Sequence, residues 1–214
     1  MPQPPSYEKG TESGSPDGFR GAMRRRLIAA REALPPAQHR AASDAIEGRL
    51  ERLLLGLAPT VIGFCWPFRA EFDCRPLIVR FMTRGARAAL PVMVTPRAAM
   101  VFREWRECSA VIEDRYGIHI PREGATLVPE VILMPVNAFD EAGYRLGYGG
   151  GYFDRTLAAL TPRPLSVGVG FELARVSSIG PQAHDQRLDY VVTEAGCFRA
   201  EHGALVPMPL SSGD

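Results

Sequence analysis

The sequence predicts a single α/β domain in which a central, mostly parallel β-sheet is flanked by helices. Three observations support this fold class. The 214 residues are enough for one large core, and their 46% apolar and 23% charged content is ordinary for a globular protein. Short apolar runs alternate with amphipathic helical patterns along the chain, as in α/β proteins. There is no internal repeat. We expect a disordered Pro/Gly/Ser-rich leader over 1–18, the domain over 19–200, and a C-terminal tail over 201–214.

The composition excludes several classes of function. A formal net charge of +1 gives no reason to expect a surface for nucleic acid. No apolar run is long enough to span a membrane, and the polar N-terminus is not a signal peptide. The four cysteines contain no CxxC pair, which fits a reducing cytosol. We therefore expect a cytoplasmic protein without a nucleic-acid or membrane partner. We also expect a monomer, although nothing in the composition bears on this. Its basic residues are arginines except Lys9.

The first helix is expected to begin near Phe19. Its apolar stripe consists of Met23, Leu27, Ala30 and Leu34. Three arginines, Arg20, Arg24 and Arg31, lie on a neighbouring face because steps of four and seven residues return to nearly the same angle. The commoner role of such a face is to be solvated.

The remaining elements follow in order. Pro35-Pro36 ends the first helix and opens a second, and Asp73 is a candidate N-cap for a third helix that Gly85 can end. A helical pattern also covers Asp154 to Leu160. Residues Ser109 to Pro129 look irregular, and Val176 to Leu188 looks like a loop. The predicted strands are Thr60 to Phe64, Ala88 to Pro91, Met100 to Arg103, Val131 to Val136, Leu165 to Phe171 and, as the last strand, Asp189 to Thr193.

The stretch from Met134 to Arg155 combines the end of a buried strand, a glycine loop and a helix start. Such a loop lets backbone N–H groups converge on an anion without interference from Cβ atoms. Arg145 supplies a fork of donors before the loop, and Asp154 supplies a metal ligand or an N-cap after it. The glycines match neither the dinucleotide fingerprint nor the Walker loop, and a plain tight turn would explain them equally well. Together with the residues around them, they indicate a nucleotide phosphate site.

The segment NAFDEAGYRLGYGGGYFDR resembles the signature of the 5-formyltetrahydrofolate cyclo-ligases, also called methenyltetrahydrofolate synthetases. The resemblance extends to the basic N-terminal helix, the loop from Trp66-Pro67 to Glu71, the Gly117-Ile118 turn and the segment HDQRLDYVVTE. It implies the NagB/RpiA/CoA-transferase-like fold of that family. It also implies ATP-dependent closure of 5-formyltetrahydrofolate to 5,10-methenyltetrahydrofolate, with Mg²⁺ as cofactor and release of ADP and phosphate.

The resemblance also implies roles for individual residues. Arg145 and Asp154 would be catalytic, and Asp154 and Asp185 would hold Mg²⁺, whose hard charge suits carboxylate oxygens. The expected ATP-binding residues are Arg20, Arg24, Arg145, Leu146, Gly147, Tyr148, Gly149, Gly150, Gly151, Tyr152 and Phe153. The expected folate-binding residues are Glu71, Trp66, Tyr148 and Tyr152. Arg31 matches none of the family's nucleotide-contacting positions and is expected to face solvent. Without the resemblance, Asp185 would be a turn residue and Glu71 an exposed acid.

Three positions depart from the family pattern. Phe153 stands where a second tyrosine is common, Ala174 where a glutamine often follows the strand, and Ile120 where an acid is common. Ala174 and Ile120 leave open an ATP-dependent paralogue that acts on another N-acyl substrate. A non-catalytic module that binds ATP or folate is the other alternative.

Overall fold

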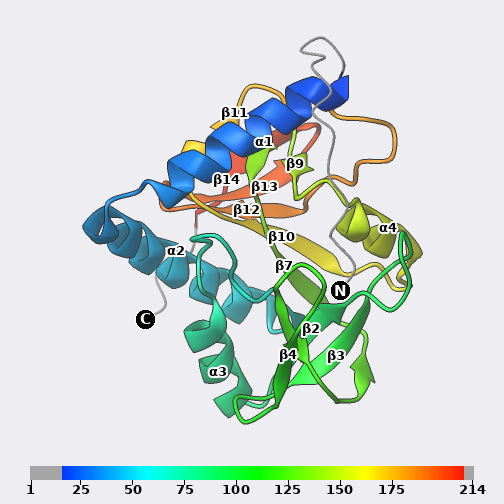
Figure 1. Ribbon diagram of the computed structural model, residues 1–214. Helices are drawn as coiled ribbons and strands as arrows, with labels where there is room; N and C mark the ends of the chain where they lie inside the picture. The colour runs from blue at the N-terminus through cyan, green and yellow to red at the C-terminus, as the bar shows by residue number, and fades with distance from the viewer. Residues whose placement is uncertain (1–15, 210–214) are drawn as a thin grey trace.

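The computed structural model describes residues 16–209 and confirms the α/β class (Figure 1). The helices are α1 (Pro16–Glu32), α2 (Pro36–Leu57), α3 (Arg75–Thr83) and α4 (Tyr152–Ala159), with a 3-10 turn η1 (Glu172–Ala174). The strands are β1 (Val61–Gly63), β2 (Arg87–Val92), β3 (Val101–Trp105), β4 (Val111–Glu113), β5 (His119–Pro121), β6 (Thr126–Leu127), β7 (Val131–Pro135), β8 (Ala138–Asp140), β9 (Arg145–Leu146), β10 (Leu165–Val169), β11 (Arg175–Val176), β12 (Tyr190–Val192), β13 (Cys197–Glu201) and β14 (Ala204–Pro207).

The main sheet has nine strands in the order β14-β13-β12-β10-β7-β1-β2-β3-β6. Its five central strands, β12 to β2 in that order, are parallel, as the alternation of strands and helices predicts. Two antiparallel strands are added at each edge, so the sheet is mixed. Its two faces bury alternate residues. In β7, Val131 and Leu133 pack with α2 and α3, whereas Ile132 and Met134 pack with α4.

Three stretches differ from the sequence-based expectation. The supposedly irregular Ser109 to Pro129 contains the β4–β5 hairpin and the edge strand β6. The strand at Asp189 to Thr193 is not the last one, because β13 and β14 extend the sheet into the expected tail. Helix α1 begins within the expected leader, whose residues 1–15 lie outside the described part of the chain. Strands β6 and β14 lie at the two edges of the main sheet, and β4 and β5 form a separate two-stranded sheet.

The topology predicts where a ligand would bind. From β1 the chain proceeds to β2 on one side and later returns to β7 on the other. The order of the parallel strands therefore reverses between β1 and β7, and ligands bind at the carboxyl ends of strands at such a point. A small sheet, β11-β8-β9, lies beside this edge, and α1 packs on it through Met23 and Leu27.

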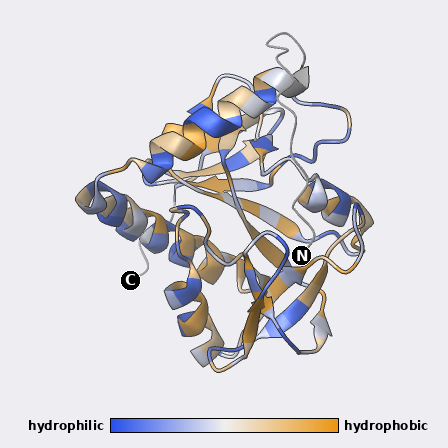
Figure 2. Ribbon diagram, in the orientation of Figure 1, coloured by the Kyte–Doolittle hydropathy of each residue, from blue (hydrophilic) through white to orange (hydrophobic). Residues whose placement is uncertain are grey.

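Apolar segments of the central strands lie between the helices, while the helices carry hydrophilic residues as well (Figure 2). None of the helices within residues 16–209 combines the length and the apolar character needed to cross a bilayer.

Candidate active site

The glycine loop joins β9 to α4 and adopts backbone conformations that require glycine. Gly149 has φ +92° and Gly151 has φ +61°, in the left-handed region. A Cβ at Gly149 would lie 3.4 Å from Cζ of Arg24, and one at Gly151 would lie 2.9 Å from an Arg155 nitrogen. The Gly149 contact is ordinary and the Arg155 guanidinium can shift, so the left-handed backbone, rather than a lack of space, favours glycine at both positions.

Backbone N–H groups of this loop face outward. Within residues 16–209, the N–H groups of Gly149 and Gly150 donate to no protein acceptor, and both residues are exposed. Arg24 reaches the loop from α1, and its Nε donates to the Gly147 carbonyl at 2.6 Å. The structure thus brings a guanidinium beside available amide donors, which is the arrangement that an anionic phosphate needs.

Arg145 and Asp154 form a buried ion pair at the inner side of the loop. The Nη2 atom of Arg145 lies 3.4 Å from Oδ1 of Asp154, which also accepts the Gln186 N–H at 3.1 Å. Burial lowers the pKa of the Arg145 guanidinium, and the carboxylates of Asp154 and Asp185 oppose this shift. Asp154 is not the N-cap of α4, which is Gly151. Its carboxylate instead joins α4 to the loop before β12.

Asp185 is paired with Arg20 across the site. Two guanidinium nitrogens of Arg20 donate to the two carboxylate oxygens, at 2.5 and 3.0 Å. The Gln182 N–H also donates to Asp185, at 2.7 Å. Burial by itself would raise the pKa of Asp185, but the Arg20 hydrogen bonds and this N–H bring it below its usual value. The basic face of α1 is therefore part of the site.

The loop that carries Glu71 is held in a strained conformation. Arg69 (φ +50°) and Ala70 (φ +57°) both occupy the left-handed region, which costs non-glycine residues energy. Two side chains hold their carbonyls: Nε of Arg31 donates to Arg69 at 3.0 Å, and Nε2 of His39 lies 3.0 Å from the Ala70 oxygen. Helices α1 and α2 thereby fix the position of Glu71.

The Glu71 carboxylate lies in a buried polar cluster. It accepts the Tyr148 hydroxyl at 2.6 Å and the Phe68 N–H at 3.0 Å. Burial raises the pKa of Glu71, although these donors and Arg31 partly offset the effect. Burial, together with the neighbouring carboxylate, also raises the pKa of Tyr148. The structure thus joins two of the predicted folate-binding residues, Glu71 and Tyr148, by a hydrogen bond.

Arg31 lies at the centre of this cluster, so the expectation that it faces solvent is wrong. It is 4% exposed, and its Nη2 lies 3.3 Å from the Tyr148 hydroxyl and 3.7 Å from the Glu71 carboxylate. Its Nη1 donates to Oδ1 of Asn137 at 3.0 Å. A signal was available in the sequence, since Arg31 continues the buried four-residue spacing of Met23 and Leu27.

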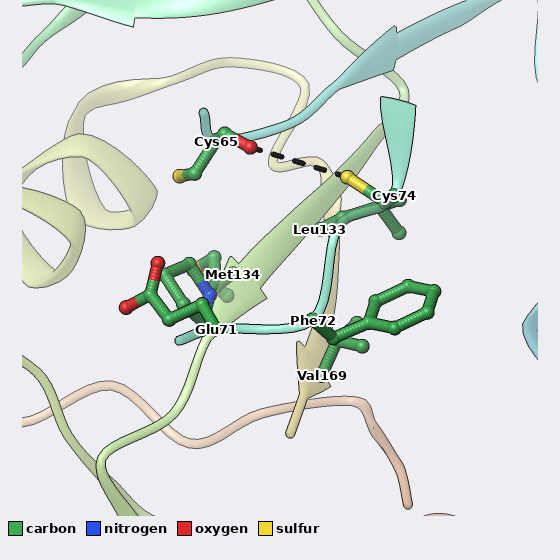
Figure 3. A pocket seen from close by; sticks show the side chains of 8 residues that line it. Cys65, Glu71, Phe72, Cys74, Leu133, Met134 and Val169 are labelled. Carbon is green, nitrogen blue, oxygen red and sulfur yellow. Dashed lines mark hydrogen bonds between the residues drawn. The ribbon is translucent and has the colours of Figure 1, made fainter. Parts of the chain in front are cut away.

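A small cavity of about 20 Å³ lies beside this cluster, at the ends of β7 and β10 (Figure 3). It is lined by Cys65, Glu71, Phe72, Cys74, Leu133, Met134, Pro135 and Val169. The Cys74 thiol is directed at the Cys65 carbonyl, 4.0 Å away. Burial raises the pKa of both thiols, so both stay protonated. The cavity has room for about one water molecule. A larger ligand has to contact Glu71 from the loop side.

Three predicted site residues have side chains that contact other parts of the molecule, and a fourth, Phe153, lies against Arg145. The Leu146 side chain is fully buried in the apolar cluster under α1, so any contact of this residue with ATP has to come from its backbone. Trp66 stacks on His119 at 5.0 Å and packs against the main core. The Tyr152 hydroxyl accepts from Arg115 of the β4–β5 hairpin. Phe153 lies against the Arg145 guanidinium, 5.2 Å from ring centre to Cζ.

An α/β sheet with a glycine loop of exposed amides and a buried carboxylate at its switch point is the arrangement of a class of proteins that bind a small-molecule ligand at the carboxyl ends of the strands. The model of the 5-formyltetrahydrofolate cyclo-ligase family matches residues 18–194, and the chain belongs to that family.

Individual relatives agree with this assignment. The chain is 37% identical over 107 residues to the 5-formyltetrahydrofolate cyclo-ligase of Escherichia coli K12, a stretch covering 47% of this chain and 58% of that enzyme. It is 29% identical to the enzyme of Mycolicibacterium smegmatis, over 80% of this chain and 91% of that one. The NMR structure of Aquifex aeolicus 5,10-methenyltetrahydrofolate synthetase superposes with a TM-score of 0.74 at 25% identity, covering 91% of this chain and 100% of that one.

Proposed function

We propose that this protein is an ATP-dependent cyclo-ligase that converts 5-formyltetrahydrofolate to 5,10-methenyltetrahydrofolate, ADP and phosphate. The observation that carries the proposal is the juxtaposition of two half-sites around one loop. Gly149 and Gly150 offer N–H groups to phosphates, and the preceding loop residue, Tyr148, contacts the buried carboxylate of Glu71. Family membership supplies the chemistry that such a pair of half-sites serves.

The reaction needs activation of a poor leaving group. The formyl oxygen attacks the γ-phosphorus of ATP, ADP leaves, and an iminium phosphate forms. N10 then attacks the formyl carbon and loses its proton, and phosphate departs with the former formyl oxygen. Both steps depend on positioning and on stabilising negative charge. The buried guanidinium of Arg145 and the Arg24 guanidinium are the cations that would stabilise charge on the phosphates.

Asp154 and Asp185 are the proposed Mg²⁺ ligands. No group of three candidate ligand side chains occurs within residues 16–209. Two carboxylates nevertheless fit this ion, because Mg²⁺ is usually held by one or two carboxylates together with substrate phosphates. Bound there, the ion would neutralise phosphate charge. Arg20 pairs with Asp185, so it has to release this carboxylate for the ion and would then be placed to contact a phosphate.

Glu71 is the proposed acceptor for ring N–H groups of the folate. Tyr148 is 41% exposed and lies in the glycine loop, and its hydroxyl occupies one Glu71 oxygen. A folate N–H would replace this hydroxyl. ATP binding at the glycine loop and folate binding at Glu71 would therefore be linked through Tyr148. Trp66 and Tyr152 remain predicted folate contacts. To reach the folate, Trp66 would have to leave His119 and Tyr152 would have to leave Arg115, both in the β4–β5 hairpin.

The proposal is tested by mixing the protein with Mg-ATP and 5-formyltetrahydrofolate and following the near-ultraviolet absorbance of the methenyl product. The proposed function predicts product and ADP in equal amounts. Binding of both ligands without ADP would instead identify a non-catalytic module, and ADP formation only with another N-acyl substrate would identify a paralogue. We also propose a cytoplasmic monomer, which agrees with the four free cysteines.

A further inference from the structure

Asn137, between β7 and β8, carries a buried amide group that the proposed function has not used. The residue is 2% exposed. Its Oδ1 accepts a hydrogen bond from Nη1 of Arg31 at 3.0 Å. Its Nδ2 has no hydrogen-bond partner within the described part of the chain. Native proteins rarely leave a buried donor unpaired, and such a group commonly has a functional reason.

The orientation of this amide is fixed by its neighbour. A guanidinium can only donate hydrogen bonds, so the atom of Asn137 that faces Arg31 has to be the oxygen. A flipped amide would place Nδ2 against Nη1 and lose the contact. Arg31 is itself held by the Arg69 carbonyl, at 3.0 Å from its Nε. The unpaired Nδ2 is therefore a preorganised donor rather than a freely rotating one.

The same guanidinium contacts both the amide that carries this donor and the Glu71 carboxylate. While Nη1 of Arg31 contacts Asn137, Nη2 lies 3.7 Å from the Glu71 carboxylate. A donor and an acceptor thus sit around one planar group at the carboxyl ends of β7 and β1. A neighbouring donor and acceptor are complementary to a cyclic amide, in which an N–H adjoins a C=O. The 4-oxo pteridine ring of a reduced folate has this edge, formed by N3–H and the C4 carbonyl.

We propose that Asn137 is a specificity-determining residue whose Nδ2 donates to the C4 carbonyl of the pteridine while Glu71 accepts from the adjacent ring N–H. This inference rests on the proposed function, because it names the ring edge that the site recognises. The carbon of the C4 carbonyl is bonded to the ring carbon that carries N5. Anchoring it therefore restricts where the formyl group on N5 can lie relative to the glycine loop.

The decisive variant is Asn137→Asp, which keeps the shape and the oxygen that faces Arg31 but turns the donor into an acceptor. Two probes are titrated: 5-formyltetrahydrofolate and its analogue with a 4-amino group in place of the 4-oxo group. The parent should prefer the 4-oxo ligand by at least tenfold. Asn137→Asp should reduce this preference at least tenfold, because an acceptor at this position repels the C4 carbonyl and pairs with a 4-amino donor. The 4-amino analogue lacks the N3–H from which Glu71 accepts, and this disadvantage is the same in the parent and in the variant. The apparent ATP affinity should stay within twofold.

Controls separate recognition from structure. Asn137→Leu removes both polar atoms and should weaken the 4-oxo ligand without favouring the 4-amino one. Equal effects of Asn137→Asp on both ligands would overturn the assignment. If Asn137→Asp does not fold, the affinities of the parent for the two ligands provide the test. Equal affinity of the parent for the 4-oxo and the 4-amino ligand also overturns the assignment. A parent that discriminates as expected but forms no methenyl product refutes the proposed function and leaves the assignment standing.

Discussion

Replacing Arg31 with alanine should destabilise the fold and impair the folate half-site together. The substitution removes the guanidinium that joins α1 to the Glu71 loop and to the end of β7. It leaves the Arg69 carbonyl and Oδ1 of Asn137 without their donor, and it leaves the buried Glu71 carboxylate without its cation. Arg31 also holds a loop whose backbone is strained at Arg69 and Ala70. The loss therefore exceeds that of one hydrogen bond.

The size of the effect follows from burial. Arg31 and Glu71 side chains are each 5% exposed, so solvent cannot replace the missing partner. Removing one member of a buried ion pair costs about 3–5 kcal/mol. For a chain of this length, each kcal/mol lowers the melting temperature by about 2–4 °C, which gives a loss of about 6–20 °C.

Thermal and urea unfolding of Arg31→Ala measure this loss. Arg26→Ala is the matched control, because Arg26 is an exposed arginine of the same helix, and it should stay within about 0.5 kcal/mol of the parent. The reasoning is refuted if the two variants unfold alike.

Three further predictions concern the half-sites. Asp185→Asn should lose most turnover at limiting Mg²⁺ with the fold intact; parent-like turnover would exclude this carboxylate as a ligand. Arg24→Ala should weaken ATP binding about tenfold to a hundredfold, because a charge-assisted hydrogen bond contributes about 1.5–3 kcal/mol. An unchanged ATP titration would show that Arg24 does not bind the nucleotide and that α1 has only a structural role. Glu71→Gln should weaken folate binding and spare ATP. The pKa of Glu71 lies above its usual 4.5, so its carboxylate gains a proton and loses its acceptor role as the pH falls toward that value. The folate affinity of the parent should therefore decrease with falling pH before pH 4.5 is reached. The folate affinity of Glu71→Gln should lack this decrease.

Much of the fold was predictable because the central strands are buried on both faces. Val131 to Val136 is an unbroken apolar run, and β7 lies in the middle of the sheet. The edge strands were missed where one face is solvated. In β4, Val111 is half-buried while Ile112 and Glu113 are exposed, so the strand has little apolar periodicity. The β13–β14 hairpin depends on left-handed conformations at His202 and Gly203.

The candidate site was predictable to the extent that its chemistry is local. The glycine loop and Arg145 lie in one stretch, and the structure keeps them together. Asn137 was missed because its role depends on a contact with Arg31, 106 positions away, whereas the spacing of Arg31 from Met23 and Leu27 was an overlooked signal of burial. Leu146 was assigned to ATP because it lies within the signature, yet the pleat of β9 directs its side chain into the core under α1.

The central claim is that phosphoryl transfer activates the formyl oxygen. It is tested most directly by supplying 5-formyltetrahydrofolate labelled with ¹⁸O in the formyl group, together with Mg-ATP, in ordinary water. The released phosphate is then analysed by mass spectrometry. The account predicts one ¹⁸O atom in each phosphate formed along with the methenyl product. Unlabelled phosphate accompanying that product would contradict it, because ATP would then have been hydrolysed by water without phosphorylating the substrate.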